Sequence, residues 1–367
     1  MKATFLLAKD PSHESTGDLT MARLVMGIAA ESYDVRAICL STRPESTADG
    51  WRRVPKADAD IKTIALRSAR YRKSLVHSRF DIDSVVAAID DTDSDIFVAD
   101  HTYMAEPFLR STKAGTIPLA VSTVVSETLV WKATRGLIGK LDSTRILRDE
   151  LRVARGAYTV GTYDEDEAEF YRRAGIARTH WLDLTLPPKK QVNIANSGNR
   201  LVFFGDRTWP PNQEAYKILL GWWPQICAGI DDAELCIVGT PHPDAADLDL
   251  PDGVRDLGFV DDLAGFLDTC RALVAPIATG GGVRVKILDA ASRGLPVVGT
   301  PAAVGSLSSA LGIEGIADPA VAIERCREFL LDRSAAVAAG RGLYERGEQR
   351  WQSRVPHDSV HEWLRPC

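Results

Sequence analysis

Short apolar runs alternate with longer helical patterns along most of this sequence, and the alternation is broken only once. The first half contains the strand-like runs ATFLLA, VRAICLS, IKTIAL, DIFVAD, IPLAVST and AYTVGT, with a helical pattern between the first two. Strands that alternate with helices form a parallel sheet covered by those helices. Near Leu186 the pattern stops, and the polar, turn-forming stretch PPKKQVNIANSGN (187–199) predicts a linker.

Beyond the linker the alternation begins again with RLVFFG, ELCIVG, VRDLGF, ALVAPI and LPVVGT. The sequence therefore predicts an α/β protein with two Rossmann-like, doubly wound parallel-sheet domains, 1–186 and 200–344, facing each other across a cleft. Terminal helices are expected over 345–367, where they can pack back on the first domain. A length of 367 residues agrees with two domains, because a single hydrophobic core stops growing below this size.

Charge and cysteine content narrow the classes of function. The formal net charge is -6, so the chain lacks the basic field that drives non-specific binding to nucleic acid. The cysteines show no close pair with metal-ligand spacing, and several lie in apolar runs, which predicts reduced thiols and a cytoplasmic location. The amino terminus lacks the apolar core of a signal peptide, and no run reaches the roughly 20 apolar residues of a membrane span.

The stretch LVWKATRGLIGKL (129–141) combines large apolar residues with three basic ones. This composition is typical of a surface helix with a solvated basic side, and also of a helix that lies on an anionic membrane, here the inner face. Both interpretations stay open, and the sequence predicts at most peripheral membrane contact.

Three consecutive glycines, Gly280 to Gly282, precede Arg284 and Lys286 in the stretch GGGVRVKILDA. They follow the strand-like run ALVAPI and lead into a predicted helix that stops at Gly294. Ligands of such sheets bind beyond the carboxyl ends of the strands, and the unpaired N–H groups at a helix start attract anions. Glycine lets a phosphate approach the backbone, and the two basic side chains add charge. The stretch therefore predicts a diphosphate site.

Asp289 follows Lys286 by three residues on the same helical face and precedes Arg293 by four. Its carboxylate could accept hydrogen bonds from both hydroxyls of a ribose. It could equally form a plain salt bridge with Arg293 or Lys286, and the spacing alone does not separate these two interpretations.

The segment APIATGGGVRVKILDAASRGLPVVGTPAAVGSL resembles the signature of the retaining, GT-B-type glycosyltransferases of family 4, the glycosyl transferases group 1. LVFFGDRTWPPNQEA, LCIVGTPHP and LGFVDDLAGFL are similar to earlier elements of the same domain. The resemblance is dense over 201–307 and reaches the amino-terminal half only in outline. It implies a GT-B fold and transfer of a sugar from a nucleotide-sugar donor to an acceptor hydroxyl with retention of configuration.

The resemblance also implies roles for single residues. Asp289 matches a family glutamate that holds the ribose, and Arg207 lies where the family keeps a basic residue against the diphosphate. Gly281 stands where the family has an acidic residue that touches the sugar, so backbone N–H groups are the expected contacts there. The expected donor-binding set is Gly17, Gly280, Gly281, Gly282, Val283, Arg284, Asp289, Asn212 and Thr240, and the expected catalytic set is Arg207, Lys286 and His101.

In the first domain, Gly17 matches a flexible glycine loop of the family, and Asp18 is interpreted as the cap of the following helix. His101 comes directly after the strand-like run DIFVAD and could contact the acceptor or the transferring sugar, although a histidine there is often only a loop residue. Glu127 is the single match to a His-Asn-x-Glu stretch of the family.

A preorganised set of N–H donors with Arg207, Arg284 and Lys286 would stabilise the leaving diphosphate without a metal ion. No cofactor is expected apart from the nucleotide sugar as co-substrate, and the resemblance implies that the leaving phosphate accepts the acceptor's proton. The acceptor can be a lipid, a saccharide or a natural product. Two alternatives stay open: a non-catalytic protein that keeps both sheets, and a nucleotide-sugar epimerase with His101 and Glu127 as acid and base.

Overall fold

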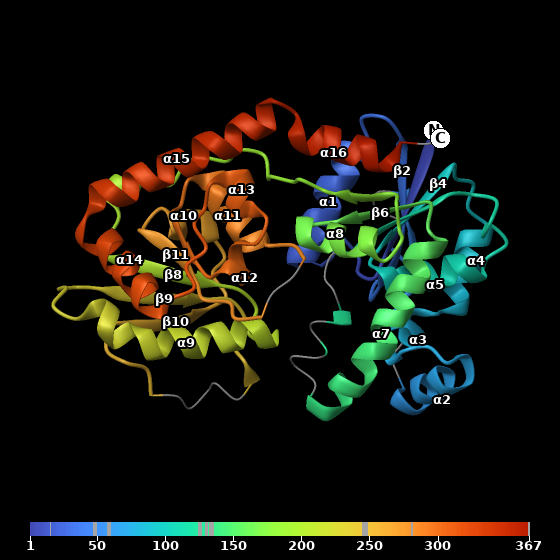
Figure 1. Ribbon diagram of the computed structural model, residues 1–367, viewed down its shortest axis with the longest axis horizontal. Helices are drawn as coiled ribbons and strands as arrows, with labels where there is room; N and C mark the ends of the chain where they lie inside the picture. The colour runs from blue at the N-terminus through green and yellow to red at the C-terminus, as the bar shows by residue number, and fades with distance from the viewer. Residues whose placement is uncertain are drawn as a thin grey trace. The chain divides into compact units, whose positions relative to one another are not determined.

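The computed structural model describes residues 1–14, 16–46, 50–56, 60–123, 127–128, 131, 136–243, 249–279 and 282–365. The chain divides into two compact units (Figure 1): Met1–Leu184 together with Val355–Cys367, and Thr185–Arg354. Each unit is built on one sheet, and every strand pair in both sheets is parallel in the part of the chain described. The prediction of two wound parallel sheets is confirmed.

The first unit has a seven-stranded sheet in the order β3-β2-β1-β4-β5-β6-β7. Its strands are β1 (Lys2–Leu7), β2 (Asp34–Ser41), β3 (Arg52–Pro55), β4 (Ile96–Asp100), β5 (Leu119–Thr123), β6 (Thr159–Thr162) and β7 (Thr179–Trp181). Its helices are α1 (Gly17–Ala29), α2 (Ile61–Tyr71), α3 (Leu75–Phe80), α4 (Asp83–Asp90), η2 (Thr102–Met104), α5 (Ala105–Arg110), α7 (Gly136–Gly156), α8 (Glu165–Arg173) and α16 (Val355–Leu364).

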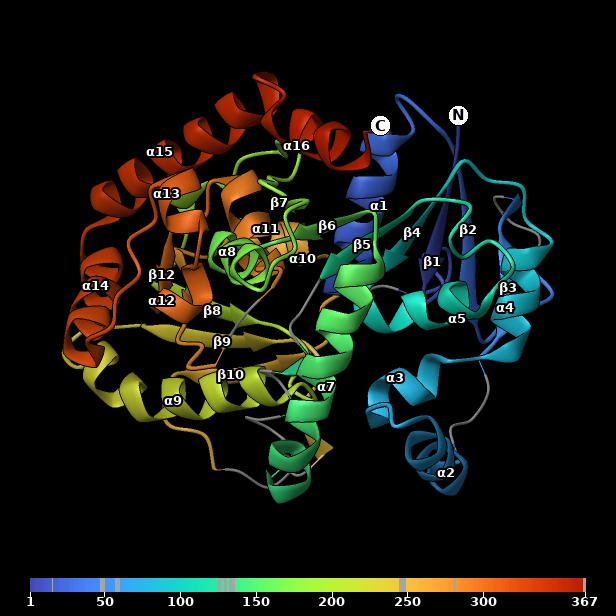
Figure 2. The same cartoon turned by 45° about the vertical axis from the view of Figure 1, so that its right-hand side comes forward.

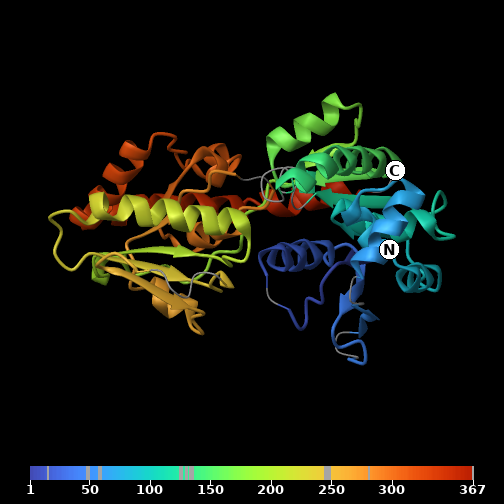
Figure 3. The same cartoon turned by 90° about the horizontal axis from the view of Figure 1, so that it is seen from below.

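The strand order reverses direction at β1, so the crossover helices cover both faces of this sheet. Figure 3 shows α1, in dark blue, on the face opposite the green helix α7. The main core lies under α4, η2, α5 and α7 and includes Leu6, Ile38, Phe97, Phe108 and Val121, all at most 2% exposed. Because β1 and β4 are neighbours in the middle of the sheet, the loops that follow them lie side by side.

The second unit has a five-stranded sheet in the order β10-β9-β8-β11-β12. Its strands are β8 (Arg200–Phe204), β9 (Glu234–Val238), β10 (Val254–Gly258), β11 (Ala272–Ala275) and β12 (Val297–Gly299). Its helices are η3 (Ile194–Asn196), α9 (Pro210–Cys227), α10 (Leu263–Leu267), α11 (Val285–Arg293), α12 (Pro301–Val304), α13 (Leu307–Leu311), α14 (Pro319–Leu331) and α15 (Arg333–Gln352). Figure 1 shows α9 and α11 on opposite faces of this sheet.

The boundaries of the predicted domains differ from those of the two units. The predicted linker 187–199 is part of the second unit, where Lys189 N–H donates to the carbonyl of Ser292 at 2.8 Å and Val192 N–H to that of Arg293 at 2.9 Å. These bonds join residues a hundred positions apart, so local turn propensity could not reveal them. In the predicted terminal segment 345–367, α15 stays with the second unit as far as Gln352, and only α16 belongs to the first.

One predicted strand is wrong. The run IKTIAL is the start of helix α2, because Asp60 caps it by accepting hydrogen bonds from the N–H groups of Lys62 and Thr63. Asp18 is not a helix cap, since the N-cap of α1 is Thr16. The predicted membrane-contact segment 129–141 lies largely outside the described residues, apart from Trp131 and the first turns of α7. Among the helices that the structure describes, none is long and apolar enough to cross a bilayer.

Candidate functional site

Helix α11 begins directly behind the glycine-rich stretch of the second unit. Its N-cap residue, Arg284, forms no side-chain cap hydrogen bond, so that side chain does not cover the N–H groups of the first turn. Gly282 has a φ of 70° and takes the chain into the helix, whereas Gly280 and Gly281 lie outside the described residues. The helix ends at Gly294 in the left-handed conformation, as predicted.

Lys286 lies in the first turn of α11 and is held by uncharged groups. Its Nζ donates to Asn212 Oδ1 at 2.7 Å and sits 4.4 Å from the centre of the Phe203 ring. No carboxylate pairs with it anywhere in the part of the chain described here. Burial lowers the pKa of this amine to about 7. A lysine that is desolvated and lacks a counter-charge is prepared to bind an anion.

Gly205, directly after β8, leaves the space that Lys286 and Asn212 occupy. Its φ is 154°, and a Cβ atom there would lie 2.9 Å from Asn212 Nδ2 and 3.2 Å from Lys286 Nζ. Asn212 is oriented from its other end as well, because Nδ2 donates to the carbonyl of Asp206 at 2.7 Å. A Cβ atom on Gly239, directly after β9, would overlap the carbonyl oxygen of Gly205. The two strand ends therefore approach each other backbone to backbone.

Arg207 has partners other than the diphosphate that the resemblance implied. Its side chain is fully buried, and Nη1 and Nη2 lie 2.5 and 2.7 Å from the two carboxylate oxygens of Asp256 in β10. Nη2 also donates to the carbonyl of Gly239 at 3.3 Å, and the Arg207 N–H donates to the carbonyl of the exposed Thr240 at 2.9 Å. This arginine thus connects the loops after β8 and β9 to strand β10.

Arg284 lies against the backbone of Gly305, at the end of α12. Its Nη1 donates to the carbonyl of Gly282 at 2.9 Å, which holds the glycine-rich stretch in place. Gly305 has a φ of 50°, and a Cβ atom there would overlap the guanidinium carbon of Arg284. The side chain therefore depends on a glycine 21 residues later in the sequence.

Asp289 is engaged by two cations. Its Oδ1 lies 2.5 Å from Lys189 Nζ, and its Oδ2 lies 3.2 Å from Arg293 Nε. The salt bridge with Arg293 was one of the two alternatives left open by the spacing, whereas the alternative pair with Lys286 is not formed. Lys189 comes from the predicted linker and was not foreseen. The carboxylate is 15% exposed, so it is oriented but still accessible.

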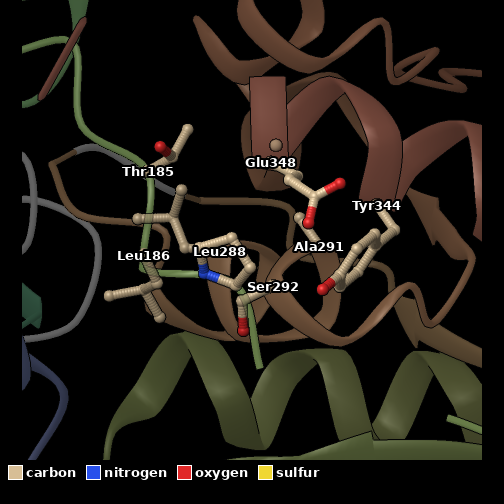
Figure 4. A pocket seen from close by; sticks show the side chains of 9 residues that line it. Thr185, Leu186, Leu288, Ala291, Ser292, Tyr344 and Glu348 are labelled. Atoms are coloured by element: carbon tan, nitrogen blue, oxygen red, sulfur yellow. The ribbon is translucent and has the colours of Figure 1, made fainter. Parts of the chain in front are cut away.

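A small pocket lies next to α11 (Figure 4). It is lined by Leu288 and Ser292 of α11, by Tyr344 and Glu348 of α15, and by Thr185, Leu186 and Pro188. Its one charged side chain is an acid, so it does not have the chemistry of a phosphate site.

In the first unit, His101 occupies a strained position directly after β4. Its φ is 84°, a value that non-glycine residues rarely adopt and that is often found at functional sites. Its ring is buried, with Nδ1 2.7 Å from the carbonyl of Asp100, and it stacks on Tyr103 at 4.8 Å. The Asp100 carboxylate accepts from Ser122 Oγ at 2.9 Å, and burial raises its pKa above the ordinary value.

Lys9 and Asp18 form an ion pair of 2.8 Å beyond the end of β1, next to this histidine loop. Burial raises the pKa of Asp18, but the charge and hydrogen bonds of Lys9 outweigh it and leave this pKa below its ordinary value. Gly17 is exposed at the first position of α1. The sequence did not reveal Lys9, whose role depends on two neighbouring loops.

The backbone of Glu127 is held by the carboxylate of Glu150. Glu150 of α7 accepts the N–H of Glu127 at 3.1 Å and the hydroxyl of Thr128 at 2.7 Å. Burial raises the pKa of Glu150 to about 7. The Glu127 carboxylate accepts from the indole of Trp131 at 3.2 Å.

The sequence of the second unit carries a family pattern. Residues 198–329 match the model of the glycosyl transferases group 1. Over these residues the chain is similar to that family. The match contains β8, β9, β10, β11 and β12 and all the residues described above around Lys286. No curated protein matches the chain as a relative.

Solved structures resemble the chain over nearly its whole length. Sucrose-phosphate synthase from Thermosynechococcus elongatus has a TM-score of 0.71 at 16% identity, over 97% of this chain and 96% of its own. WaaG, a glycosyltransferase involved in lipopolysaccharide biosynthesis, has a TM-score of 0.68 at 13% identity, over 99% and 100%. HepE of Anabaena in complex with UDP-glucose has a TM-score of 0.68 at 14% identity, over 99% of both chains. These likenesses show the GT-B fold.

The second unit thus brings together Lys286, Asn212, Arg284 and Gly282, and it places Arg207 and Thr240 in neighbouring loops. Val283 lies between Gly282 and the N-cap Arg284 and is half-buried. His101, Gly17 and Glu127 belong to the first unit. The described residues include no group of three or more histidine, cysteine, aspartate or glutamate side chains arranged to hold a metal ion.

Proposed function

We propose that this protein is a retaining glycosyltransferase that moves a sugar from a nucleotide-sugar donor to an acceptor hydroxyl. The observation that carries the proposal is Lys286 at the start of α11, a desolvated cation that has no acidic partner among the described residues and lies inside the segment that matches the group 1 family. HepE, which is similar in fold, has been solved with UDP-glucose bound, and this supports a nucleotide sugar as the donor.

In this proposal the donor diphosphate lies at the N-terminus of α11. The helix N–H groups, Lys286 and Arg284 bind its oxygens and stabilise the charge that develops when the glycosidic bond breaks, so no metal ion or further cofactor is needed. Asn212 holds the lysine in position, and Arg207 holds the loops around it. The leaving phosphate accepts the proton of the acceptor hydroxyl.

The remaining assignments concern the sugar and the acceptor. Asp289 accepts hydrogen bonds from the ribose hydroxyls, with Lys189 and Arg293 fixing the carboxylate. Thr240 and the backbone N–H groups of 280–283 contribute further donor contacts, and Gly17 and His101 serve the transferring sugar or the acceptor. We propose a hexose as the sugar, a lipid, saccharide or natural-product hydroxyl as the acceptor, and a cytoplasmic site of action.

The direct test is to measure binding and hydrolysis of UDP-, GDP- and dTDP-sugars by the wild type. Tight binding of one donor with slow release of its sugar is the expected result. A protein that binds none of these nucleotides would instead be a non-catalytic member that keeps the two sheets. Exchange of the configuration of the bound sugar, without release, would indicate an epimerase.

The ribose assignment predicts a selective effect of Asp289→Asn. An aspartate that accepts from two hydroxyls discriminates between UDP and 2′-deoxy-UDP, and we expect the wild type to prefer UDP by about tenfold, the value of one hydrogen bond to a charged group. The variant should lose most of this preference, which isothermal calorimetry can measure.

Lys189→Met is the matched control, because it breaks the same salt bridge but keeps the carboxylate. It should weaken both ligands alike and leave the preference intact. An unchanged UDP preference in Asp289→Asn would mean that Asp289 has only a salt-bridge role.

Gly305→Ala is expected to weaken UDP binding by about tenfold, because the new Cβ displaces the guanidinium of Arg284, which otherwise binds the diphosphate through charge-assisted hydrogen bonds. Gly229→Ala is the control: Gly229 also has a positive φ of 69°, but a Cβ there has no atom within 4 Å. Equal UDP affinity in both variants would rule out Arg284 as a donor contact.

A further inference from the structure

Helix α2 of the first unit exposes apolar side chains that a helix normally buries. Of its eleven residues only Ser68 is buried, whereas Ile61, Leu66 and Tyr71 are 80%, 71% and 57% exposed. Amphipathic helices of globular domains usually direct such side chains into the core. The exposed apolar surface of α2 is therefore a candidate interaction site.

The same part of the chain is strongly basic in an acidic protein. Between residues 61 and 80 there are six basic side chains and no acidic one, while the whole chain has a formal net charge of -6. The other residues together thus carry -12, because -6 minus +6 is -12. The six are Lys62, Arg67, Arg70, Arg72, Lys73 and Arg79.

Four of these six cations are exposed and have no carboxylate partner within the described residues. Arg67 and Lys73 are paired, with Asp83 at 3.8 Å and with Asp81 at 2.7 Å. By contrast, the guanidinium carbons of Arg70 and Arg79 each lie 5.6 Å from the centre of the neighbouring aromatic ring. The four unpaired cations are Lys62, Arg70, Arg72 and Arg79.

The apolar and basic residues of α2 share one exposed face. Residues four apart lie above one another on a helix, so Ile61, Ala65 and Ala69 form one row. The neighbouring row is formed by Lys62, Leu66 and Arg70, and all six residues are exposed. An apolar row therefore runs beside a row with a cation at each end.

This face is fixed to the unit from behind. Arg145 of α7 donates to the carbonyls of Ser68 at 3.3 Å and Lys73 at 3.0 Å, and Ser68 Oγ donates to the carbonyl of Lys73 at 2.7 Å. Asp60 caps the first turn. Figure 2 shows α2 beyond α3 at the margin of the first unit, away from its strands. The exposed face is thus presented by an anchored helix.

We propose that the exposed face of α2 docks the protein on an anionic lipid bilayer. The apolar row enters the interface, and the unpaired cations contact lipid phosphates, which is the arrangement of interfacial amphipathic helices. A nucleic acid would use the cations but would leave Ile61 and Leu66 in water, so the apolar row favours a bilayer. This surface belongs to the first unit and the proposed donor site to the second, and the proposal does not depend on the proposed transferase activity.

The test is co-sedimentation of the full chain with vesicles of phosphatidylcholine alone or mixed with phosphatidylglycerol. We expect binding to the mixed vesicles only, and weaker binding as salt concentration rises. Ile61→Ser with Leu66→Ser, and Lys62→Glu with Arg70→Glu, should each reduce the partition coefficient by about tenfold or more. Thermal unfolding should be unchanged in both variants, because all four side chains are exposed.

Two matched variants control for general loss of apolar surface or charge. Leu331→Ser removes a side chain that is 63% exposed in the second unit, and Lys217→Glu with Arg341→Glu changes the net charge as much as the α2 charge variant. Both should bind like the wild type. No binding to mixed vesicles, equal binding without phosphatidylglycerol, equal loss in the controls, or tight binding to a single-stranded RNA instead would each overturn the proposal.

Discussion

Lys286→Met is expected to reduce sugar release from the donor by at least about a hundredfold and, at the same time, to raise the melting temperature of the protein. The loss of activity follows because the amine is the cation aimed at the leaving diphosphate, and removing one such group typically costs this much. The gain in stability follows because a desolvated cation without an acidic partner is costly to bury. A merely structural lysine would show the opposite change in stability.

The pH dependence gives a second readout of the same residue. Burial lowers the Lys286 pKa from 10.5 to about 7. Between these two values the unfolded chain holds the proton and the folded chain does not, so stability from this group rises with pH across that window. The stability gained in Lys286→Met should therefore be largest at pH 7 and below and should fade toward pH 10.5.

Donor affinity should change in the other direction. Below pH 7 the free protein already carries the charged amine, and above it binding must take up a proton, so the dissociation constant should rise by up to about tenfold per pH unit. Lys286→Arg keeps the charge at all these pH values and should remove the dependence. A flat profile in the wild type, or a lower melting temperature in Lys286→Met, would contradict the assignment.

Arg207→Met should have the largest effect on stability. It leaves the Asp256 carboxylate without its counter-charge and removes the guanidinium that joins the end of β9 to β10. Only the guanidinium is fully buried, since the Asp256 side chain is 23% exposed, so the loss of its charge-assisted hydrogen bonds costs about 2 kcal/mol. In a unit of this size that corresponds to a fall in melting temperature of about 4–8 °C, which differential scanning fluorimetry detects.

Arg255→Met is a matched control on β10, the strand that contains Asp256. Arg255 also pairs with an acid, Glu234, but its side chain is 62% exposed. An exposed pair contributes about 0–1 kcal/mol, so the melting temperature should hardly move. If Arg207→Met kept its melting temperature and lost only donor turnover, the guanidinium would contact the diphosphate, as the sequence resemblance implied. Loss of both, with UDP affinity reduced less than in Lys286→Met, would establish the positioning role.

Much of the fold could be predicted from local sequence patterns. The strand-and-helix alternation predicted both parallel sheets because burial on two faces makes such strands continuously apolar. Helix α11 could be predicted because the signals for its start and its end both lie within the short run from Gly282 to Gly294. The strand predicted for IKTIAL was wrong because a six-residue apolar pattern fits both a strand and a helix. The cap at Asp60 makes it a helix.

The sequence by itself determined the two wound sheets, the placing of a cationic stretch after β11, and its likeness to the group 1 glycosyltransferases. The tertiary structure decided what each charge does. Arg207 is paired by Asp256, 49 residues away, and Asp289 by Lys189, 100 residues away. Lys286 has no acidic partner in the part of the chain that the structure describes. Charge pairing depends on distances of a few ångströms between segments far apart in the chain, and a linear pattern contains no such distances.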